Sequence, residues 1–389
     1  MSGSLLRSRF AAVAVRVETT PGTDAIAGSP LLADLILGDC QARFGAQVVQ
    51  DPSFSGSLDV LPPALGSFQP TLELRVPLRG TGAGGTPPSW GRLLQACAME
   101  QVIDNTGVAA TAATAGSATS LTLPVGFSNT AQIYRGVPLL LTGNPGGGAV
   151  AACLDYTSGR VATLAETYSP VLSTSTLVQV PPNVLWRPTS DESVYKTVTV
   201  YLWKDGYRWR FTGATGTARL DLSTGGIGTL VFSLQAQMLD QGANANPTLL
   251  VAGAAQQPPI FQGGKSRLLG LKAQLRSCSF DLGVSTALPP DPEAAGGVGS
   301  GVPISRASML TLDPLIDTTN QAGLFDAFRS GASGSFYAQL GTTPGNRFMA
   351  TMPSIRQLQQ DPGESQGFEA NSIRAQANLT DAGFLLCQY

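Results

Sequence analysis

Two glycine-rich motifs come closest to a phosphate-binding site in this sequence. Residues 80–85 read GTGAGG, which satisfies the G-x-G-x-x-G spacing of dinucleotide-binding loops, and residues 264–266 read GKS, the end of a phosphate-binding loop. Pro87 and Pro88 separate the first motif from the helix expected after it, and no alternating β/α units follow. The second motif has Pro259 where its first glycine is required. Neither motif therefore predicts a nucleotide site.

Catalytic and metal-ligating residues are also sparse. Histidine is absent from the 389 residues, which excludes Ser-His-Asp and Cys-His catalysis and His-ligated metal sites. The five cysteines are far apart and odd in number, so we expect buried free thiols rather than a zinc site or a disulfide framework. Acidic pairs such as Asp191/Glu192 and Asp291/Glu293 lie in predicted loops, without the apolar setting that raises one pKa. The sequence predicts no enzyme, no cofactor and no metal, and favours a protein that builds a structure.

Composition indicates a β-rich chain with no general affinity for nucleic acid. Charged residues make up 13%, Gly and Pro number 45 and 27, and the net charge is −2. Abundant turn formers with few charges are typical of many short strands, and a near-neutral chain lacks the basic footprint of a nucleic-acid-binding protein. No apolar run reaches membrane-spanning length, and the run at 10–15 is too short for a signal sequence. We expect a soluble protein made in the cytosol, with no membrane partner.

The strongest β pattern lies at residues 198–237. Polar and apolar residues alternate almost without error, and Asp205-Gly206 is a typical two-residue hairpin turn. With this turn, Leu202 lies opposite Trp209 on one face of the hairpin.

The other face of this hairpin carries Tyr201, Trp203, Arg208 and Arg210, with possible cation–π pairs between Trp203 and Arg208 and between Tyr201 and Arg210. Both faces are too apolar for open solvent. We expect one to pack on the core and the other on another subunit or on the helix predicted at 89–99. These four residues are the candidate assembly or packing face, and serine at Trp203 and Arg208 is expected to leave a folded chain that polymerises poorly.

One helix is clearly predicted, and it begins near Ser89, which can cap it. Trp90, Leu93, Leu94 and Cys97 follow at i, i+3, i+4 and i+7, so they share one apolar face that we expect to pack in the core.

The composition changes sharply in the middle of the chain. Residues 105–185 hold only four charged side chains and are dense in Thr, Ser, Gly and Ala, yet they keep strand-like runs and aromatic anchors. We therefore predict a small all-β domain at 104–190, inserted into a discontinuous domain of residues 1–103 and 191–389. The fold class is mainly β, a β-sandwich or barrel with one or two short helices, plus this inserted all-β module.

With these elements in place, residues 195–237 resemble the central block of the major tail tube proteins of long, non-contractile-tailed (siphovirus-like) bacteriophages. The matching segments are DG at 205–206, TGATG at 212–216 and GTLVFSLQ at 228–235. Further blocks agree in the same order, and they lie at 17–25, 87–100, 303–315 and 341–353. The insert is similar to a small β module of phage structural proteins, with Tyr134-Arg135-Gly136 and Asp155-Tyr156 at its characteristic places.

The resemblance implies a structural virion protein of the phage tail, assembled in the host bacterial cytoplasm. Its subunits form a homo-oligomeric ring, commonly a hexamer, and the rings stack into a tube that passes genomic double-stranded DNA and the tape measure protein. Tail terminator and distal tail proteins are the other partners implied. The insert is expected on the tube exterior, because the lumen leaves no room for it.

Three alternatives stay open at this stage. A tail terminator, distal tail or baseplate subunit would form one ring instead of a polymer. A carbohydrate-binding β protein would use tyrosines of the insert as sugar platforms. The ring would be a trimer if residues 1–103 and 191–389 each held a tube-like fold, although no internal repeat is evident.

Overall fold

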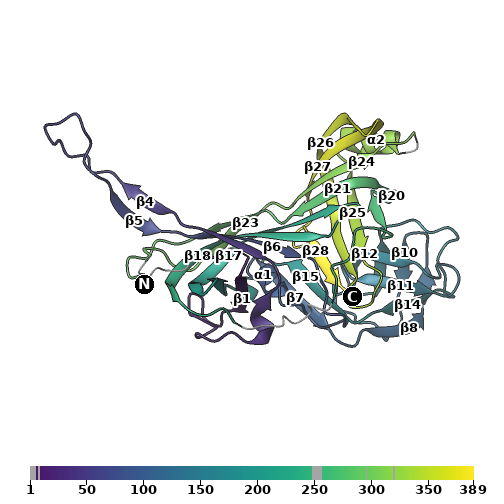
Figure 1. Cartoon of the computed structure of the whole chain (residues 1–389). Coiled ribbons are helices and arrows are strands. Elements are labelled where there is room, and N and C mark those ends of the chain that lie inside the picture. The colour runs from purple at the N-terminus through teal and green to yellow at the C-terminus, as the bar shows by residue number, and fades with distance from the viewer. Residues whose placement is uncertain (1–5, 8, 248–255, 295, 319) are drawn as a thin grey trace.

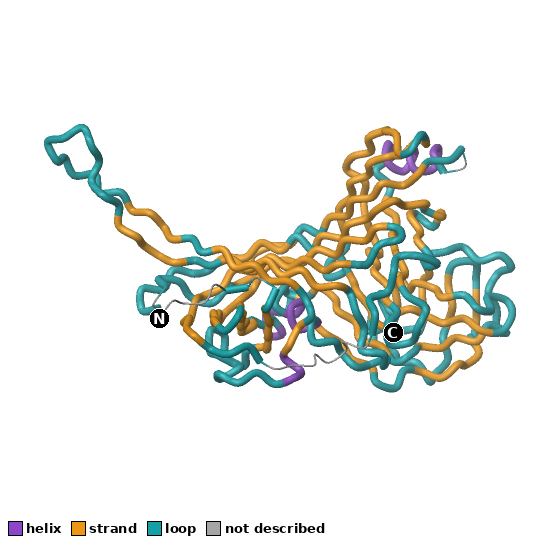
Figure 2. The backbone as a smooth tube through the Cα atoms, viewed as in Figure 1, coloured by secondary structure: helices purple, strands orange, loops and turns teal. Residues whose placement is uncertain are grey.

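The computed structural model describes residues 6, 7, 9–247, 256–294, 296–318 and 320–389. Antiparallel strands dominate it, and the mainly β fold class predicted from the sequence is confirmed (Figures 1 and 2). Among the described residues there are two α-helices, α1 (Gly91–Gln95) and α2 (Gln321–Ser330), and two 3-10 turns, η1 (Leu32–Asp34) and η2 (Glu192–Val194).

Seventeen strands hydrogen-bond into one large sheet, which divides into two groups around the long strand β17. The first group runs in the order β2-β1-β16-β17-β18-β6-β3. Its members are β1 (Ala11–Val17), β2 (Leu35–Ile36), β3 (Asp39–Arg43), β6 (Thr71–Pro77), β16 (Val198–Lys204), β17 (Tyr207–Ser223) and β18 (Thr229–Ala243).

The second group continues from the C-terminal half of β17 in the order β21-β24-β27-β26. Strand β26 then pairs with β25-β19-β20 on one side and with β28-β15-β7 on the other. The bounds are β7 (Met99–Asp104), β15 (Asn183–Pro188), β19 (Ser266–Leu268), β20 (Leu271–Lys272), β21 (Gln274–Asp281), β24 (Met309–Leu315), β25 (Ser333–Leu340), β26 (Phe348–Ser365), β27 (Phe368–Ala377) and β28 (Leu385–Gln388).

The predicted register of the first hairpin is correct. Leu202 lies opposite Trp209, and Trp203 lies opposite Arg208. The turn works because Asp205 and Gly206 both have positive φ, at 48° and 87°, a conformation that Asp and Gly tolerate better than other residues.

Helix α1 is shorter than the sequence suggested. It begins after Trp90, no side chain caps it, and Ser89 therefore lies outside the helix. Its end is set by a tight turn in which the Cys97 N–H bonds to the Leu94 carbonyl, followed by Ala98 at φ 56°. The predicted helix face (Trp90, Leu93, Leu94 and Cys97) is buried in the main hydrophobic core, where α1 packs on β1, β7 and β15.

The insert forms its own seven-stranded sheet in the order β8-β14-β11-β12-β13-β10-β9 around its own core. These strands are β8 (Val108–Ala112), β9 (Ala115–Gly116), β10 (Ser120–Thr122), β11 (Pro138–Thr142), β12 (Val150–Tyr156), β13 (Val161–Leu164) and β14 (Leu177–Val180). The range 104–190 is wider than this sheet. Strand β15 lies inside that range but pairs with β7 and β28 of the large sheet, so the module replaces the turn of the β7/β15 hairpin.

Two short ribbons complete the fold. Strands β4 (Ala46–Val49) and β5 (Ala64–Phe68) continue the β3/β6 hairpin away from the body, and we call residues 46–68 the arm (Figure 1). Strands β22 (Val284–Ala287) and β23 (Val302–Arg306) form the second ribbon, which lies against β17.

Candidate functional site

The predicted assembly face of the first hairpin is covered by the chain itself. Tyr201 and Trp203 are 0% and 1% exposed, and they form a small cluster with residues of β1 and of the segment 18–36. The Trp203 Nε1–H also donates to Asn244 Oδ1 at 3.0 Å. These two side chains therefore contact neither helix α1 nor open solvent, and they are not a surface for another subunit. Serine at Trp203 is expected to destabilise the fold instead of impairing assembly alone.

Of the two predicted cation–π pairs, the pair of Tyr201 with Arg210 is confirmed and the pair of Trp203 with Arg208 is wrong. Arg208 and Arg210 both lie over the ring of Tyr201, at 5.2 and 5.8 Å from its centroid, instead of one arginine over each aromatic ring. Arg210 forms ion pairs with Asp240 and, at 3.3 Å, with Asp24, whose carboxylate also accepts a hydrogen bond from the Tyr201 hydroxyl. The side chains of this face therefore contact the segment 18–36 of the same chain and hold it against the sheet.

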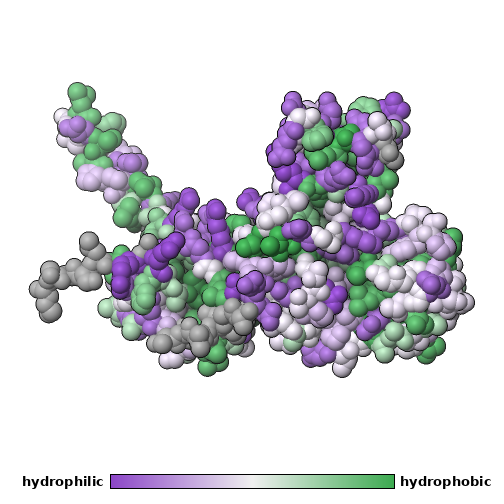
Figure 3. All heavy atoms as spheres, turned by 45° about the vertical axis from the view of Figure 1, so that its right-hand side comes forward, coloured by the Kyte–Doolittle hydropathy of each residue, from purple (hydrophilic) through white to green (hydrophobic). Residues whose placement is uncertain are grey.

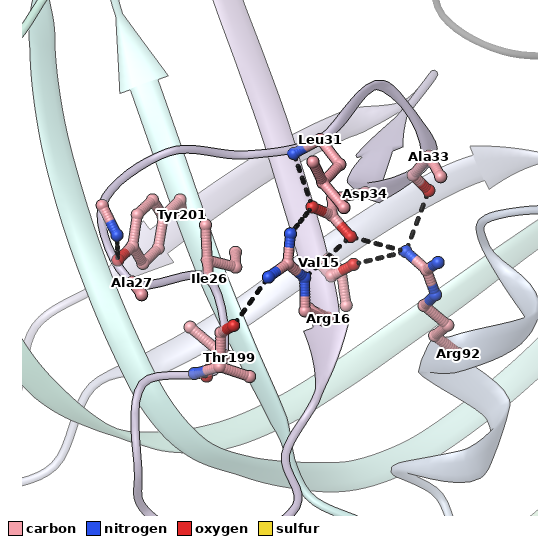
Figure 4. Close-up of polar contacts among 12 residues, drawn as sticks. Val15, Arg16, Ile26, Ala27, Leu31, Ala33, Asp34, Arg92, Thr199 and Tyr201 are labelled. Atoms are coloured by element: carbon pink, nitrogen blue, oxygen red, sulfur yellow. Dashed lines mark hydrogen bonds and ion pairs between the residues drawn. The ribbon is translucent and has the colours of Figure 1, made fainter.

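A buried carboxylate clamps the same segment at its other end (Figure 4). Asp34 is 1% exposed and bridges Arg16 on β1 and Arg92 on α1, with its Oδ1 3.1 Å from Arg16 Nε and 3.0 Å from Arg92 Nη1. The Leu31 N–H donates to Oδ2 at 2.7 Å. Burial opposes ionisation of Asp34, but these hydrogen bonds and the two cationic charges outweigh it and lower its pKa.

Glu18 is a second buried carboxylate, and it is held by neutral donors. Its oxygens accept hydrogen bonds from the N–H groups of Gly22 and Gly213 at 2.7 and 2.8 Å, and from the hydroxyls of Thr197 and Thr199 at 2.6 and 2.9 Å. All four donors belong to turns and strands around the first hairpin. Glu18 is only 3% exposed, and its hydrogen bonds hold these turns and strands together.

The glycine motif at 80–85 serves packing. The Gly80 N–H donates to Asn346 Oδ1 at 2.8 Å, and a Cβ on Gly80 would lie 2.0 Å from the Gly345 carbonyl oxygen. This contact explains why a side chain is not tolerated there.

The GKS motif joins the insert to the body. Lys265 Nζ and Arg267 Nε lie 3.1 and 3.4 Å from the carboxylate of Glu166, which also accepts a hydrogen bond from the Tyr337 hydroxyl. Glu166 belongs to the insert, whereas the other three belong to the body. Together with apolar contacts of Ala165 against Tyr337, this cluster attaches the insert firmly to the large sheet.

The acidic pair Asp191/Glu192 does not have the properties of a catalytic acid and base. Asp191 caps the turn η2, and the hydrogen bond from Ser193 lowers its pKa, whereas a general acid needs a raised one. No group of three or more His, Cys, Asp or Glu side chains with metal-binding geometry occurs among the described residues.

The five cysteines are all buried and unpaired. Burial raises the pKa of Cys40 and Cys153 to about 12 and raises the pKa values of Cys97, Cys278 and Cys387 as well. A buried neutral thiol is a poor nucleophile.

We therefore expect no thiol of the native protein to react with Ellman's reagent within minutes at pH 8, and all five to react in denaturant. The absorbance of the released thiolate measures both numbers. One thiol that reacts rapidly in the native protein would contradict the packing described for these residues.

The large sheet has a polar outer face. Along β6, residues Leu72, Leu74 and Val76 point into the core, so the alternate side chains point outward. Outward side chains of β6, β17, β21 and β24 form ion pairs within this face, and the pairs are Glu73–Arg75 at 2.8 Å, Asp221–Arg219 at 3.0 Å and Asp313–Arg276 at 2.8 Å. Acidic and basic groups balance, so the face is hydrophilic without attracting an anionic polymer strongly.

The arm exposes large apolar side chains fully. Phe54, Leu58 and Val60 are 104%, 107% and 86% exposed at its tip, and Figure 3 shows apolar residues gathered along it. Strand edges are open as well: within the described part of the chain, β3 and β23 each pair on one side only, and Ile304 of β23 is exposed. Exposed apolar patches and unpaired edges mark surfaces that bind protein.

No protein-family model matches the sequence, and no curated protein matches it significantly. Within the described ranges, no helix is both long and apolar enough to cross a membrane. The distinctive features of the molecule are therefore geometric: a projecting apolar arm, open strand edges and a broad, charge-balanced sheet face.

Proposed function

We propose that this chain is a structural subunit that self-assembles into stacked rings, forming the tail tube of a long-tailed bacteriophage. The tube is the conduit for genomic DNA and for the tape measure protein, and its ends contact tail terminator and distal tail proteins. Six subunits per ring is the proposed symmetry, and three is the alternative. The proposal joins the sequence resemblance to one structural observation, the arm.

The arm supports self-assembly because its apolar tip has no packing partner within a single chain. Three apolar side chains at its tip are almost entirely exposed, and burying them would contribute about 1.5–3 kcal/mol each. In a self-assembling chain, the arm of one copy would contact a different surface of the next copy. Contacts of this kind are heterologous, and they generate closed rings or open polymers.

The polar sheet face supports a conduit. A wall around passing DNA must be hydrophilic without holding the phosphates, since each unpaired Lys or Arg contact would add affinity. The ion pairs Glu73–Arg75 and Arg276–Asp313 neutralise the arginines of this face in place. We propose that this face lines the lumen and that the insert lies outside the tube.

The burial of the insert tyrosines argues against the carbohydrate-binding alternative but does not bear on the single-ring alternative. A carbohydrate-binding role needs exposed aromatic platforms, but Tyr134 and Tyr156 are 7% and 0% exposed and pack edge to face in the insert core. A single-ring tail component fits the same arm and edges, so it remains the second candidate.

Electron microscopy of the purified chain separates the tube from the single ring. At high protein concentration we expect long tubes of constant diameter with a regular axial repeat. Isolated rings that do not stack would favour the terminator or distal tail alternative. A chain that stays monomeric under all conditions would contradict both.

A further inference from the structure

Two neighbouring cavities lie on strands β1, β3 and β6 and beside helix α1, and they share Leu37, Pro77 and Arg79 in their linings. One has a volume of about 600 Å³ and an apolar lining that includes Trp90, Pro87 and Pro88. The other, of about 820 Å³, lies along β3, and both are lined by Arg79. We call the two together the Arg79 groove. Of its lining residues, Arg75 also belongs to the polar sheet face and Arg92 to the Asp34 clamp, whereas Arg9, Arg79 and Lys204 belong to neither.

The Arg79 groove is strongly basic. Its lining holds five basic side chains (Arg9, Arg75, Arg79, Arg92 and Lys204) and one acidic side chain, Asp39. Arg75 and Arg92 are neutralised by Glu73 and Asp34. Among the described residues, the side chains of Arg9, Arg79 and Lys204 form no hydrogen bond or ion pair, and Arg79 Nε is buried without a partner. A buried guanidinium N–H without an acceptor is costly, and a carboxylate is its best partner.

The arm has the complementary chemistry. Residues 46–68 contain Asp51 and Asp59 and no Lys or Arg, so the arm carries a charge of −2. Neither carboxylate is paired with a cation in the part of the chain that the structure describes. The two acidic groups flank Phe54 and Leu58, so the tip presents apolar side chains between carboxylates, as a groove with an apolar floor and basic walls requires.

The arm of the same chain does not fill the groove. Phe44 at its base stacks between Phe68 and the buried Phe211, with ring centroids 5.9 and 6.2 Å apart, and the Phe68 N–H bonds to the Gly296 carbonyl at 3.1 Å. These contacts direct the arm away from the body (Figure 1). The groove, by contrast, lies on the body from which the arm departs.

We propose that the Arg79 groove is the receptor for the arm tip of a second copy of this chain. This inference rests on the proposed function and specifies the contact between neighbouring subunits. Asp59 or Asp51 of one copy pairs with Arg79 of the next. Phe54 and Leu58 cover the apolar floor of the groove near Trp90. Each copy carries both the arm and the groove, so the contact repeats from copy to copy.

Disulfide cross-linking between two variants, each with one introduced cysteine, tests the contact. Leu58→Cys places a thiol on the arm tip, and Thr86→Cys places one on the groove, where the Thr86 side chain is exposed. The five native thiols are buried and do not compete. We expect a mixture of the two variants to give a covalent dimer under mild oxidation, at least tenfold more than a control mixture of Val125→Cys on the exposed surface of the insert with Thr86→Cys.

A charge swap tests the role of Arg79 in the same experiment. Arg79→Glu in the Thr86→Cys variant is expected to lower the yield at least fivefold, and Asp59→Arg in the Leu58→Cys variant is expected to restore it. Higher salt is expected to lower the wild-type yield, because ion pairs at the groove mouth are screened.

The results of these experiments test the arm–groove contact separately from the proposed tube function. If wild-type protein forms tubes but the arm–groove mixture links no better than the control mixture, the groove is not the receptor and the proposed function stands. If Arg79→Glu leaves the yield unchanged, the assigned ion pair is wrong. If wild-type protein forms neither tubes nor rings, the proposed function and this contact both fall.

Discussion

A chain without its arm tip is expected to fold normally and to remain monomeric. The hairpin can be shortened cleanly because Val49 and Ala64 are paired across β4 and β5, so residues 50–63 can be replaced by Asn-Gly, a favoured two-residue turn. Phe54, Leu58 and Val60 are lost with the tip. Their burial in an assembly is worth about 5 kcal/mol or more per contact, so we expect at least a 1,000-fold rise in the concentration needed for assembly, measured by sedimentation and electron microscopy.

Two controls accompany the shortened arm. Its thermal unfolding midpoint is expected within a few degrees of wild type, because the exposed tip residues contribute to none of the hydrophobic cores. Val125→Ser, which changes a comparably exposed apolar residue on the insert, is expected to assemble like wild type. Tubes formed by the shortened chain at the wild-type concentration would show that the arm does not drive assembly.

Replacement of Asp34 by alanine is expected to have the largest effect on stability. It leaves Arg16 and Arg92 facing each other without their shared carboxylate, and it removes the acceptor of the Leu31 N–H. Removal of one partner from a buried ion pair costs about 3–5 kcal/mol, and the partial exposure of both arginines places the loss near 3 kcal/mol. Urea unfolding followed by fluorescence measures it, with Arg43→Ala as control because its pair with Glu73 is long and exposed.

The pH dependence gives a second readout of the Asp34 clamp. Because the pKa of Asp34 is lower in the folded chain than in the unfolded chain, its contribution is full above about pH 4 and is lost as the pH falls through the folded pKa. The difference in unfolding free energy between wild type and Asp34→Asn should therefore shrink below about pH 4. A difference that is constant between pH 3 and pH 7 would mean that Asp34 is not stabilised as a carboxylate.

Local patterns predicted the hairpin and the helix face well. The turn at Asp205-Gly206 determines the register, because only one pairing places both residues at positive φ. The spacing of Trp90, Leu93 and Leu94 identifies a buried face even though α1 is only five residues long. Both features depend on neighbours in sequence.

Features that depend on distant residues were not predictable. The segment that covers Tyr201 and Trp203 is held by the polar contacts of two carboxylates, Asp24 and Asp34, whose positions follow no periodic pattern in the sequence. The change in composition predicts an insert that ends at 190, whereas hydrogen bonding assigns β15 to the large sheet.

The projection of the arm is not predictable from the sequence for a related reason. Residues 50–63 read as a turn-rich loop with scattered apolar residues, a pattern that fits a loop folded onto the body as well as one that projects from it. Only the continuation of the β3/β6 hairpin into β4 and β5 shows that the tip leaves the body. The Arg79 groove likewise combines residues from β1, β3, β6 and β16 that lie far apart in the sequence.

A cryo-electron microscopy reconstruction of the assembled wild-type chain tests the central claim most directly. The predicted result is a tube of stacked rings whose lumen is lined by the polar face of β6, β17, β21 and β24, with the insert outside and each arm tip on a neighbouring copy. An assembly with the insert in the lumen or with this polar face on the outside would contradict the account, as would arms that contact no other copy.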